Sequence, residues 1–221
     1  MNAVLRQLVL KDLYFARGVM LGAMVIALIS IPLLALGAIG RFSAMILMVF
    51  AGAAPASFIS GMLIVSERKE RANLFSLSLP VSCRQMLIAK MLAAATAYFI
   101  PWIVLLVGTF TFFSVNHVPR GLLPFATMLW VFLLDQFFLC LAVAVSSRTE
   151  GWFTVVIVAC SLSISFYIFT FMSLPSVTAH LPSITAVWSP IVIHVIAAEL
   201  LVALAFASFI GWQLARRRDF I

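Results

Sequence analysis

Residues 18–40 read GVMLGAMVIALISIPLLALGAIG, a stretch without a single aspartate, glutamate, lysine or arginine. Arg41 follows, and residues 42–66 then form a second charge-free stretch. A transmembrane helix needs about 20 consecutive apolar residues to cross roughly 30 Å of hydrocarbon. Each stretch is therefore long enough to cross a bilayer once, and the pair predicts a helical membrane protein.

Apolar runs of the same kind continue through the rest of the chain. The run at 151–198 is too long for one helix, and Pro175, Pro182 and Pro190 divide it because proline ends helices. The runs are continuously apolar instead of alternating, which excludes the strands of a membrane barrel. We therefore predict an all-α membrane protein, with a single transmembrane domain over residues 1–221. Its six spans are expected near 17–40, 44–66, 88–114, 122–146, 151–173 and 191–215.

The composition agrees with a membrane protein and excludes several other classes. Of the 221 residues, 65% are hydrophobic and 10% are charged, whereas a soluble domain has about 45–50% apolar and about 25% charged residues. So few polar side chains cannot cover a water-facing surface. The composition excludes a soluble enzyme, a disordered chain and a nucleic-acid-binding domain, although the net charge is +7.

The positions of the basic residues predict the orientation of the chain. If the N-terminus is cytoplasmic, all Lys and Arg residues except Arg41 and Arg120 lie on the cytoplasmic side of the predicted spans. Cytoplasmic loops of membrane proteins carry an excess of these residues. We therefore expect both termini in the cytoplasm, with the cations facing the headgroups of membrane lipids, and we expect no nucleic-acid partner.

Two cytoplasmic segments have patterns of their own. In residues 1–16, apolar side chains recur at helical spacing while Arg6, Lys11 and Asp12 fall on the other side. This favours an amphipathic helix on the membrane surface over a simple extension of the first span. Residues 67–90, ERKERANLFSLSLPVSCRQMLIAK, form the longest cytoplasmic loop. Exposed Leu and Phe side chains are costly in water, so this loop either lies on the membrane or inserts into a soluble partner.

The same loop resembles that of the permeases of type-2 ATP-binding-cassette (ABC) exporters. The resemblance rests on Glu67 at the end of the second span, on residues 78–82 (SLPVS), and on Arg84 and Lys90 before an apolar span. The closing residues 216–220, RRRDF, and the six-span plan with cytoplasmic termini also resemble this family. The resemblance therefore extends over the whole chain.

The resemblance implies a membrane subunit that pairs with a second permease subunit, of the same or a related chain, and with a cytoplasmic ABC ATPase subunit. The loop at 67–90 would carry a coupling helix that docks on the ATPase. Short re-entrant outer helices would join the fifth and sixth spans. The expected location is the bacterial inner (plasma) membrane. The residues expected to couple to the ATPase are Glu67, Arg71, Leu79, Pro80, Val81, Ser82 and Arg84.

The chain has no GxxxxGK[ST] motif, the loop that holds the phosphates of a nucleotide. We therefore expect no cofactor in this chain, and we expect ATP and Mg to bind in the partner ATPase. The predicted function is a transporter subunit, not an enzyme. It would move a hydrophobic or amphipathic substrate (a lipid, a peptide or a drug-like molecule) out of the cytoplasm by alternating access.

Polar residues inside the predicted spans are candidates for the translocation path. A carboxyl group near the bilayer centre costs about 2.5–3.5 kcal/mol on insertion scales, so it normally faces protein or water. Such a patch would contact a substrate headgroup or a cation. Interhelical hydrogen bonds that hold the helices together are the other interpretation. The candidates are Asp135, Gln136, Ser161, Ser165 and Glu199.

Other functions are compatible with parts of the sequence. An ion-coupled carrier or an intramembrane enzyme would use Asp135 and Glu199, and a membrane scaffold would transport nothing. The aromatic residues near the outer end of the fifth span, Phe166, Tyr167, Phe169 and Phe171, are expected to contact lipid or the membrane interface. A hydrophobic exit path lined by these residues is the other interpretation. The three histidines lack the i, i+4 spacing of helical metal ligands, so we expect no metal site.

Overall fold

In a computed structural model of the chain, residues 3–66, 83–116, 119–147 and 149–216 are described, and every regular element within these ranges is a helix. Six of the helices are long and apolar enough to cross a membrane, which confirms the predicted all-α architecture. Uninterrupted helices are expected here because a backbone in hydrocarbon must satisfy all its hydrogen bonds internally. The elements are α1 (Ala3–Leu33), α2 (Gly37–Ser60), the π-helix η1 (Gly61–Ser66), α5 (Cys83–Val115), α6 (Leu122–Ser146), α7 (Glu150–Ser173), α8 (Pro175–Thr178) and α9 (Pro190–Arg216).

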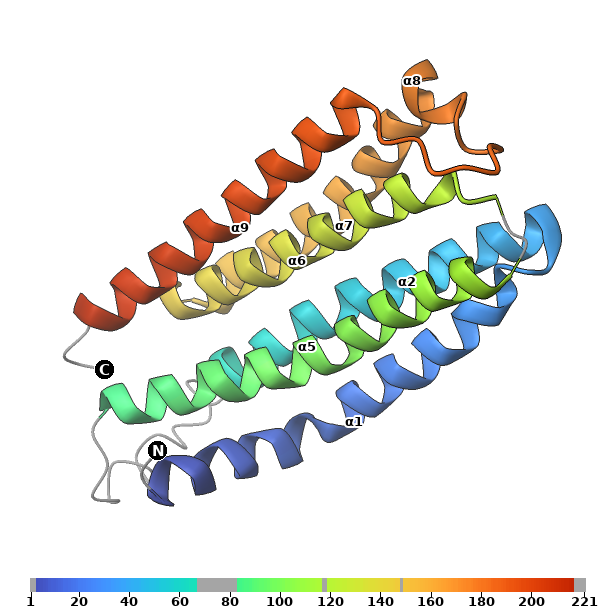
Figure 1. The fold of residues 1–221 in the computed structure, drawn as a ribbon. Helices are drawn as coiled ribbons and strands as arrows, with labels where there is room; N and C mark the ends of the chain where they lie inside the picture. The colour runs from blue at the N-terminus through green and yellow to red at the C-terminus, as the bar shows by residue number, and fades with distance from the viewer. Residues whose placement is uncertain (1–2, 67–82, 117–118, 148, 217–221) are drawn as a thin grey trace.

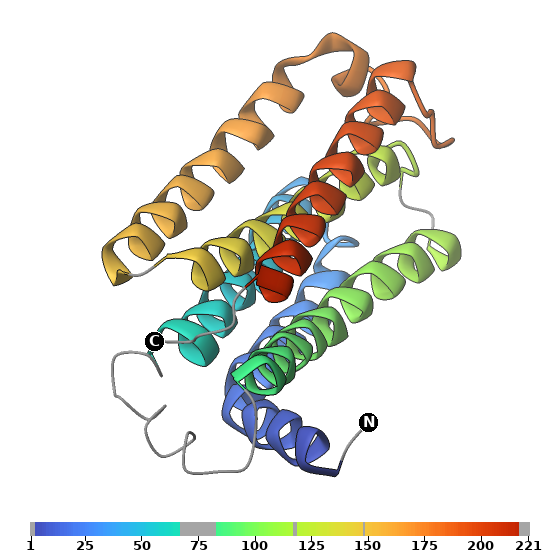
Figure 2. The ribbon, with the colours of Figure 1, turned by 90° about the vertical axis from the view of Figure 1, so that its left-hand side faces the viewer.

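The long helices form two groups that meet at α6 (Figures 1 and 2). Helix α1 packs against α5 and α2, whereas α9 and α7 each pack against α6. Helix α6 also contacts α2, so it lies in the middle of the bundle, and most of its length is buried. At Gly52 of α2 the two helices come so close that an added Cβ would lie 2.7 Å from Cδ1 of Leu133.

Helices α7 and α9 lie at the edge of the bundle and bury only one narrow stripe each. Figure 2 shows them apart from each other, with α6 between and behind them. The rest of their surface is apolar and exposed, for example at Phe166, Phe169 and Leu204. In a membrane this surface would face lipid. The buried stripes are Phe153, Cys160, Ile164 and Tyr167 on α7, and Val192, Glu199, Ala203 and Ile210 on α9.

The turn between α1 and α2 lies earlier in the sequence than the predicted boundary of the first span. Helix α1 ends at Leu33, shortly after Pro32, and α2 begins at Gly37. Gly37 has φ of +70°, a conformation that L side chains rarely adopt. Arg41, which the sequence places between two spans, therefore lies within α2, where its Nε donates a hydrogen bond to the carbonyl of Gly37 at 3.1 Å.

The segments at the two ends of the bundle differ in part from expectation. Helix α1 is continuous from Ala3 and would be about 46 Å long at 1.5 Å per residue, so the residues of the predicted surface helix are joined directly to the first span. Between α7 and α9 the structure has the four-residue helix α8 followed by turns (Figure 1). The backbone N–H of Gly121, before α6, donates to the carbonyl of Ser183 in this linker at 3.0 Å. Re-entrant insertion of this linker stays a prediction.

Candidate functional site

Three of the predicted translocation residues line one groove between α6, α7 and α9. Asp135 and Gln136 are neighbours near the middle of α6, and Glu199 lies on the buried stripe of α9. The groove has a volume of about 390 Å³. Its other lining residues are Phe132, Leu139, Tyr167, Val195, Ala198, Val202 and Phe206.

A hydrogen bond between side chains joins α7 to α9 at this groove. The hydroxyl of Tyr167 donates to Oε1 of Glu199 at 2.6 Å. The Tyr167 ring also stacks on Phe132 of α6, with ring centroids 4.1 Å apart. Since α7 and α9 otherwise pack separately against α6, Tyr167 links all three helices at one depth.

The polar side chains of the groove keep acceptor atoms without a protein partner. Asp135, Gln136 and Glu199 are 7%, 6% and 7% exposed. Gln136 donates through Nε2 to the hydroxyl of Ser163 at 3.1 Å. Yet Oδ1 of Asp135, Oε1 of Gln136 and Oε2 of Glu199 receive no hydrogen bond from any residue that the structure describes. Buried polar atoms are normally paired, so these three oxygens favour a site that receives a donor from outside the chain.

The ionisable side chains that line the groove are acidic. Its described lining residues include two carboxyl side chains and no lysine, arginine or histidine. An apolar and aromatic wall thus surrounds a small set of acceptors, which is the usual construction of a site for a small amphipathic molecule. A positively charged or hydrogen-bond-donating headgroup would complete it.

The two serines predicted to lie on the path, Ser161 and Ser165, do not line this groove. Ser161 and Ser165 are exposed on α7, and the Ser161 hydroxyl bonds to its own helix at the carbonyl of Ile157. Ser161 lines a separate groove of about 220 Å³ between α2 and α7, which Gln136 also reaches. The helix face that meets α6 instead carries Ser163, which the sequence pattern did not single out.

A second polar cluster lies where α1, η1 and α5 meet. Nζ of Lys90 donates to the carbonyl of Leu63 at 3.0 Å and lies 3.8 Å from Oδ2 of Asp12. Lys90 and Asp12 are each 3% exposed. Leu63 belongs to the π-helix η1, a type of element that often occurs at functional positions. Lys90 therefore fastens the end of the second span to the start of the third and to α1.

This cluster corrects one detail of the predicted surface helix and lies close to the predicted coupling loop. Asp12 was assigned to the solvated face of residues 1–16, but it is buried against Lys90. η1 ends at Ser66 and α5 begins at Cys83. Residues 83–90 of the predicted loop therefore belong to α5, and the elements that Lys90 joins flank residues 67–82. Arg84 is exposed in the first turn of α5. The other predicted coupling residues, Glu67, Arg71, Leu79, Pro80, Val81 and Ser82, lie outside the described residues.

Comparison with known proteins gives one match. The model of a protein family described as "ABC-2 family transporter protein" matches residues 7–211. No curated protein and no solved structure matches the chain significantly. The family match covers nearly the whole chain, including all six long helices in whole or in large part. The chain therefore belongs to the ABC-2 transporter family and is an integral membrane component of an ABC transporter.

Proposed function

We propose that the chain is the membrane-spanning subunit of an ABC exporter, in which a separate cytoplasmic ATPase drives alternating access. The ATPase would bind ATP and Mg and dock on the loop that contains residues 67–82. A second permease subunit, identical or related, would complete the path. Both termini would lie in the cytoplasm of a bacterial inner membrane, in agreement with the distribution of Lys and Arg.

The observation that carries this proposal is the Lys90 cluster. A loop that receives force from a partner can move the spans only if its two ends are firmly attached to them. Lys90 binds the Leu63 carbonyl on one side of the loop and lies on the helix that begins on the other side. Lys90 and Asp12 are almost fully buried. Water therefore competes little for the hydrogen bond and the ion pair that Lys90 makes.

The groove between α6, α7 and α9 supports an amphipathic substrate. Its wall is mostly apolar, and its unpaired oxygens lie on Asp135, Gln136 and Glu199. A hydrocarbon portion would contact the aromatic wall while a donor group on the substrate pairs with the oxygens. Movement of α7 relative to α9 would break or form the Tyr167–Glu199 hydrogen bond, so occupancy of the groove is expected to depend on the conformational state.

Transport into proteoliposomes tests the proposal. The chain is purified with its ATPase and reconstituted, and the movement of a fluorescent long-chain amine is followed after addition of Mg-ATP. We expect ATP-dependent transport that falls at least tenfold in Glu199→Gln. Glu150→Gln, at the exposed start of α7, is the matched control and should transport normally.

The same vesicles distinguish an exporter from an ion-coupled carrier. The carrier hypothesis is supported by the buried carboxyl groups of Asp135 and Glu199. It predicts transport that a proton or sodium gradient drives without ATPase and without nucleotide. Such gradient-driven transport, with no response to ATP, would replace the exporter proposal.

A further inference from the structure

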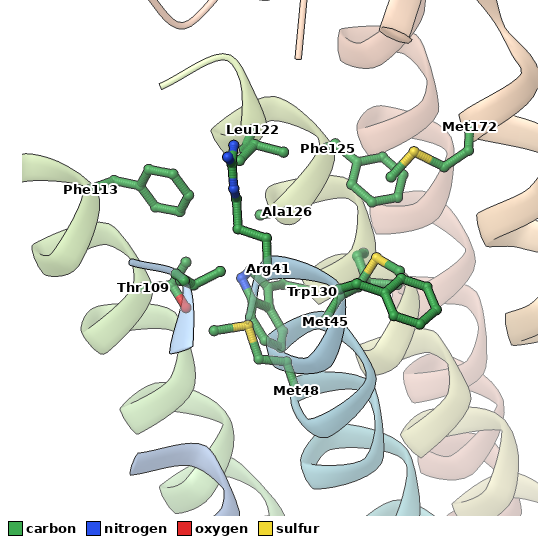
Figure 3. A pocket seen from close by; sticks show the side chains of 13 residues that line it. Arg41, Met45, Met48, Thr109, Phe113, Leu122, Phe125, Ala126, Trp130 and Met172 are labelled. Carbon is green, nitrogen blue, oxygen red and sulfur yellow. The ribbon is translucent and has the colours of Figure 1, made fainter. Parts of the chain in front are cut away.

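A second cavity lies at the end of the bundle away from the first residues of α1 and the last of α9. It has a volume of about 190 Å³ and is formed by the turn after α1, the beginnings of α2 and α6, and the later parts of α5 and α7 (Figure 3). Met45, Met48, Phe113 and Phe125 provide much of its apolar lining. Methionine and phenylalanine adapt readily to a hydrocarbon chain, because methionine is flexible and polarizable.

Two buried polar groups in the wall of this cavity have no hydrogen-bond partner within residues 3–66, 83–116, 119–147 and 149–216. Thr109 and Trp130 are each 1% exposed, and both the Thr109 hydroxyl and the Trp130 indole nitrogen lack a hydrogen bond. Trp130 Nε1 is a donor only, and a hydroxyl can also donate. Each group would gain a hydrogen bond if an oxygen acceptor reached it from the cavity.

Among the hydroxyl and indole groups of the described residues, the buried ones without a hydrogen bond are those of Ser60, Thr109 and Trp130. Other hydroxyls in the long helices, such as those of Thr96 and Thr127, donate to the carbonyl four residues earlier, which is the common behaviour of Ser and Thr in helices. The indole nitrogen of Trp102 donates to the carbonyl of Trp130 at 3.1 Å. Thr109 and Trp130 depart from both patterns, and both line the same cavity.

Arg41 supplies the charge of the cavity. It is the only basic residue among the described residues that line the cavity, and Figure 3 shows it extended along the cavity toward Leu122. Its Nε is held by the carbonyl of Gly37, which orients the guanidinium group. The part of the chain that the structure describes contributes no aspartate or glutamate to the cavity wall. An arginine at an otherwise apolar cavity is complementary to an anionic oxygen group attached to a hydrocarbon chain.

We propose that this cavity binds an anionic amphiphile. The hydrocarbon chain lies among the methionine and phenylalanine side chains, and the oxygens of the carboxylate or phosphate head accept hydrogen bonds from Arg41, Trp130 and Thr109. The site is separate from the groove of Asp135 and Glu199, with which it shares no lining residue. The proposal therefore does not depend on what the groove transports.

Quenching of Trp130 fluorescence by a brominated amphiphile tests this proposal on the full chain. Trp102, Trp152, Trp188 and Trp212 are replaced by Phe, and the protein is purified in an uncharged detergent. Titration with dibromostearate is expected to give saturable quenching, whereas dibromostearyl alcohol, which lacks the charge, should bind at least tenfold more weakly. Dibrominated phosphatidylglycerol, added in parallel, distinguishes a phospholipid source from a fatty acid source.

Matched variants identify the residues responsible. We expect Arg41→Gln to raise the apparent Kd for the anionic amphiphile about tenfold, and Arg120→Gln, outside the cavity, to leave it unchanged. Ala126→Phe, which fills the cavity without removing a polar group, should abolish saturable quenching. Gel filtration and circular dichroism verify folding of each variant, and Thr109→Val offers a milder test if Ala126→Phe does not fold. Equal binding of acid and alcohol, or equal Kd values for the Arg41 and Arg120 variants, would overturn the proposal.

Discussion

Replacing Lys90 with methionine removes a buried cation while keeping a side chain of similar length. The change deletes the 3.0 Å hydrogen bond to the Leu63 carbonyl and the ion pair with Asp12, which is 3% exposed. Removing one member of a buried ion pair typically costs about 3–5 kcal/mol. Nζ of Lys11 also lies 3.8 Å from Asp12, and its side chain is half exposed, so it compensates part of the loss. We therefore expect a free-energy change near the lower end, about 3 kcal/mol.

Thermal unfolding in detergent measures this loss. A thiol-reactive dye reports unfolding when Cys140 and Cys160, both buried and free, become accessible, and a Cys83→Ser background removes the third thiol. At about 2–4 °C per kcal/mol for a chain of this size, the midpoint should fall by about 6–12 °C. Lys11→Met is the matched control and should shift it by no more than about 4 °C, because exposed ion pairs contribute roughly 0–1 kcal/mol.

A double-mutant cycle separates the pair from each residue alone. Asp12→Asn combined with Lys90→Met should cost clearly less than the sum of the two single changes, because both changes remove the same ion pair, which can be lost only once. Equal midpoints for Lys90→Met and Lys11→Met, or strictly additive losses in the cycle, would refute the assigned role of Lys90.

Three further predictions follow from distances in the structure. Tyr167→Phe removes the hydrogen-bond donor to Glu199 and should lower the free energy of unfolding by about 1.5–3 kcal/mol. Tyr14→Phe, at an exposed ring, should not lower it, and equal thermal midpoints for the two variants would show that the bond does not hold α7 to α9. The Sγ atoms of Cys140 and Cys160 lie 3.9 Å apart, so a membrane-permeable oxidant should join them in a disulfide. The number of dye-reactive thiols in the unfolded protein should then drop by about two, and an unchanged number contradicts this packing of α6 on α7. Gly52→Ala places a methyl group 2.7 Å from Leu133 and should destabilise the protein by about 1–3 kcal/mol. Gly22→Ala, where an added Cβ would meet nothing within 4 Å, should not destabilise it. A thermal midpoint for Gly52→Ala at or above that of the unmodified chain argues against the close approach of α2 and α6.

The sequence was sufficient to predict the six helices because hydrocarbon imposes a simple rule. A charge-free run of about 20 residues crosses the bilayer as a helix whatever its neighbours do. The boundary near Arg41 was less predictable. A charged residue is an intuitive place for a turn, yet an arginine close to a helix end can extend its head away from the apolar region. The turn instead follows Pro32 and uses Gly37.

The partners of the polar residues could not be read from local patterns. Helical spacing placed Asp12 with other charged residues, and nothing nearby indicates that Lys90 on a different helix covers it. Tyr167 was grouped with lipid-facing aromatic residues of its span, but the packing of α7 and α9 on α6 turns it toward Glu199. Ser163 rather than Ser161 or Ser165 meets Gln136, because the rotation of a helix that is apolar on all sides is decided only by its neighbours.

Retention of an ATPase by the purified chain tests the central claim most directly. The tagged chain is isolated in mild detergent from cells of its own host, once intact and once with residues 79–81 deleted, and thermal unfolding confirms that both are folded. The account predicts that the intact chain retains a Mg-ATP-hydrolysing subunit in stoichiometric amount and that the deletion variant loses it. An ATPase retained equally by both chains would contradict docking at this loop, and an intact chain with no associated ATPase would contradict the proposed function itself.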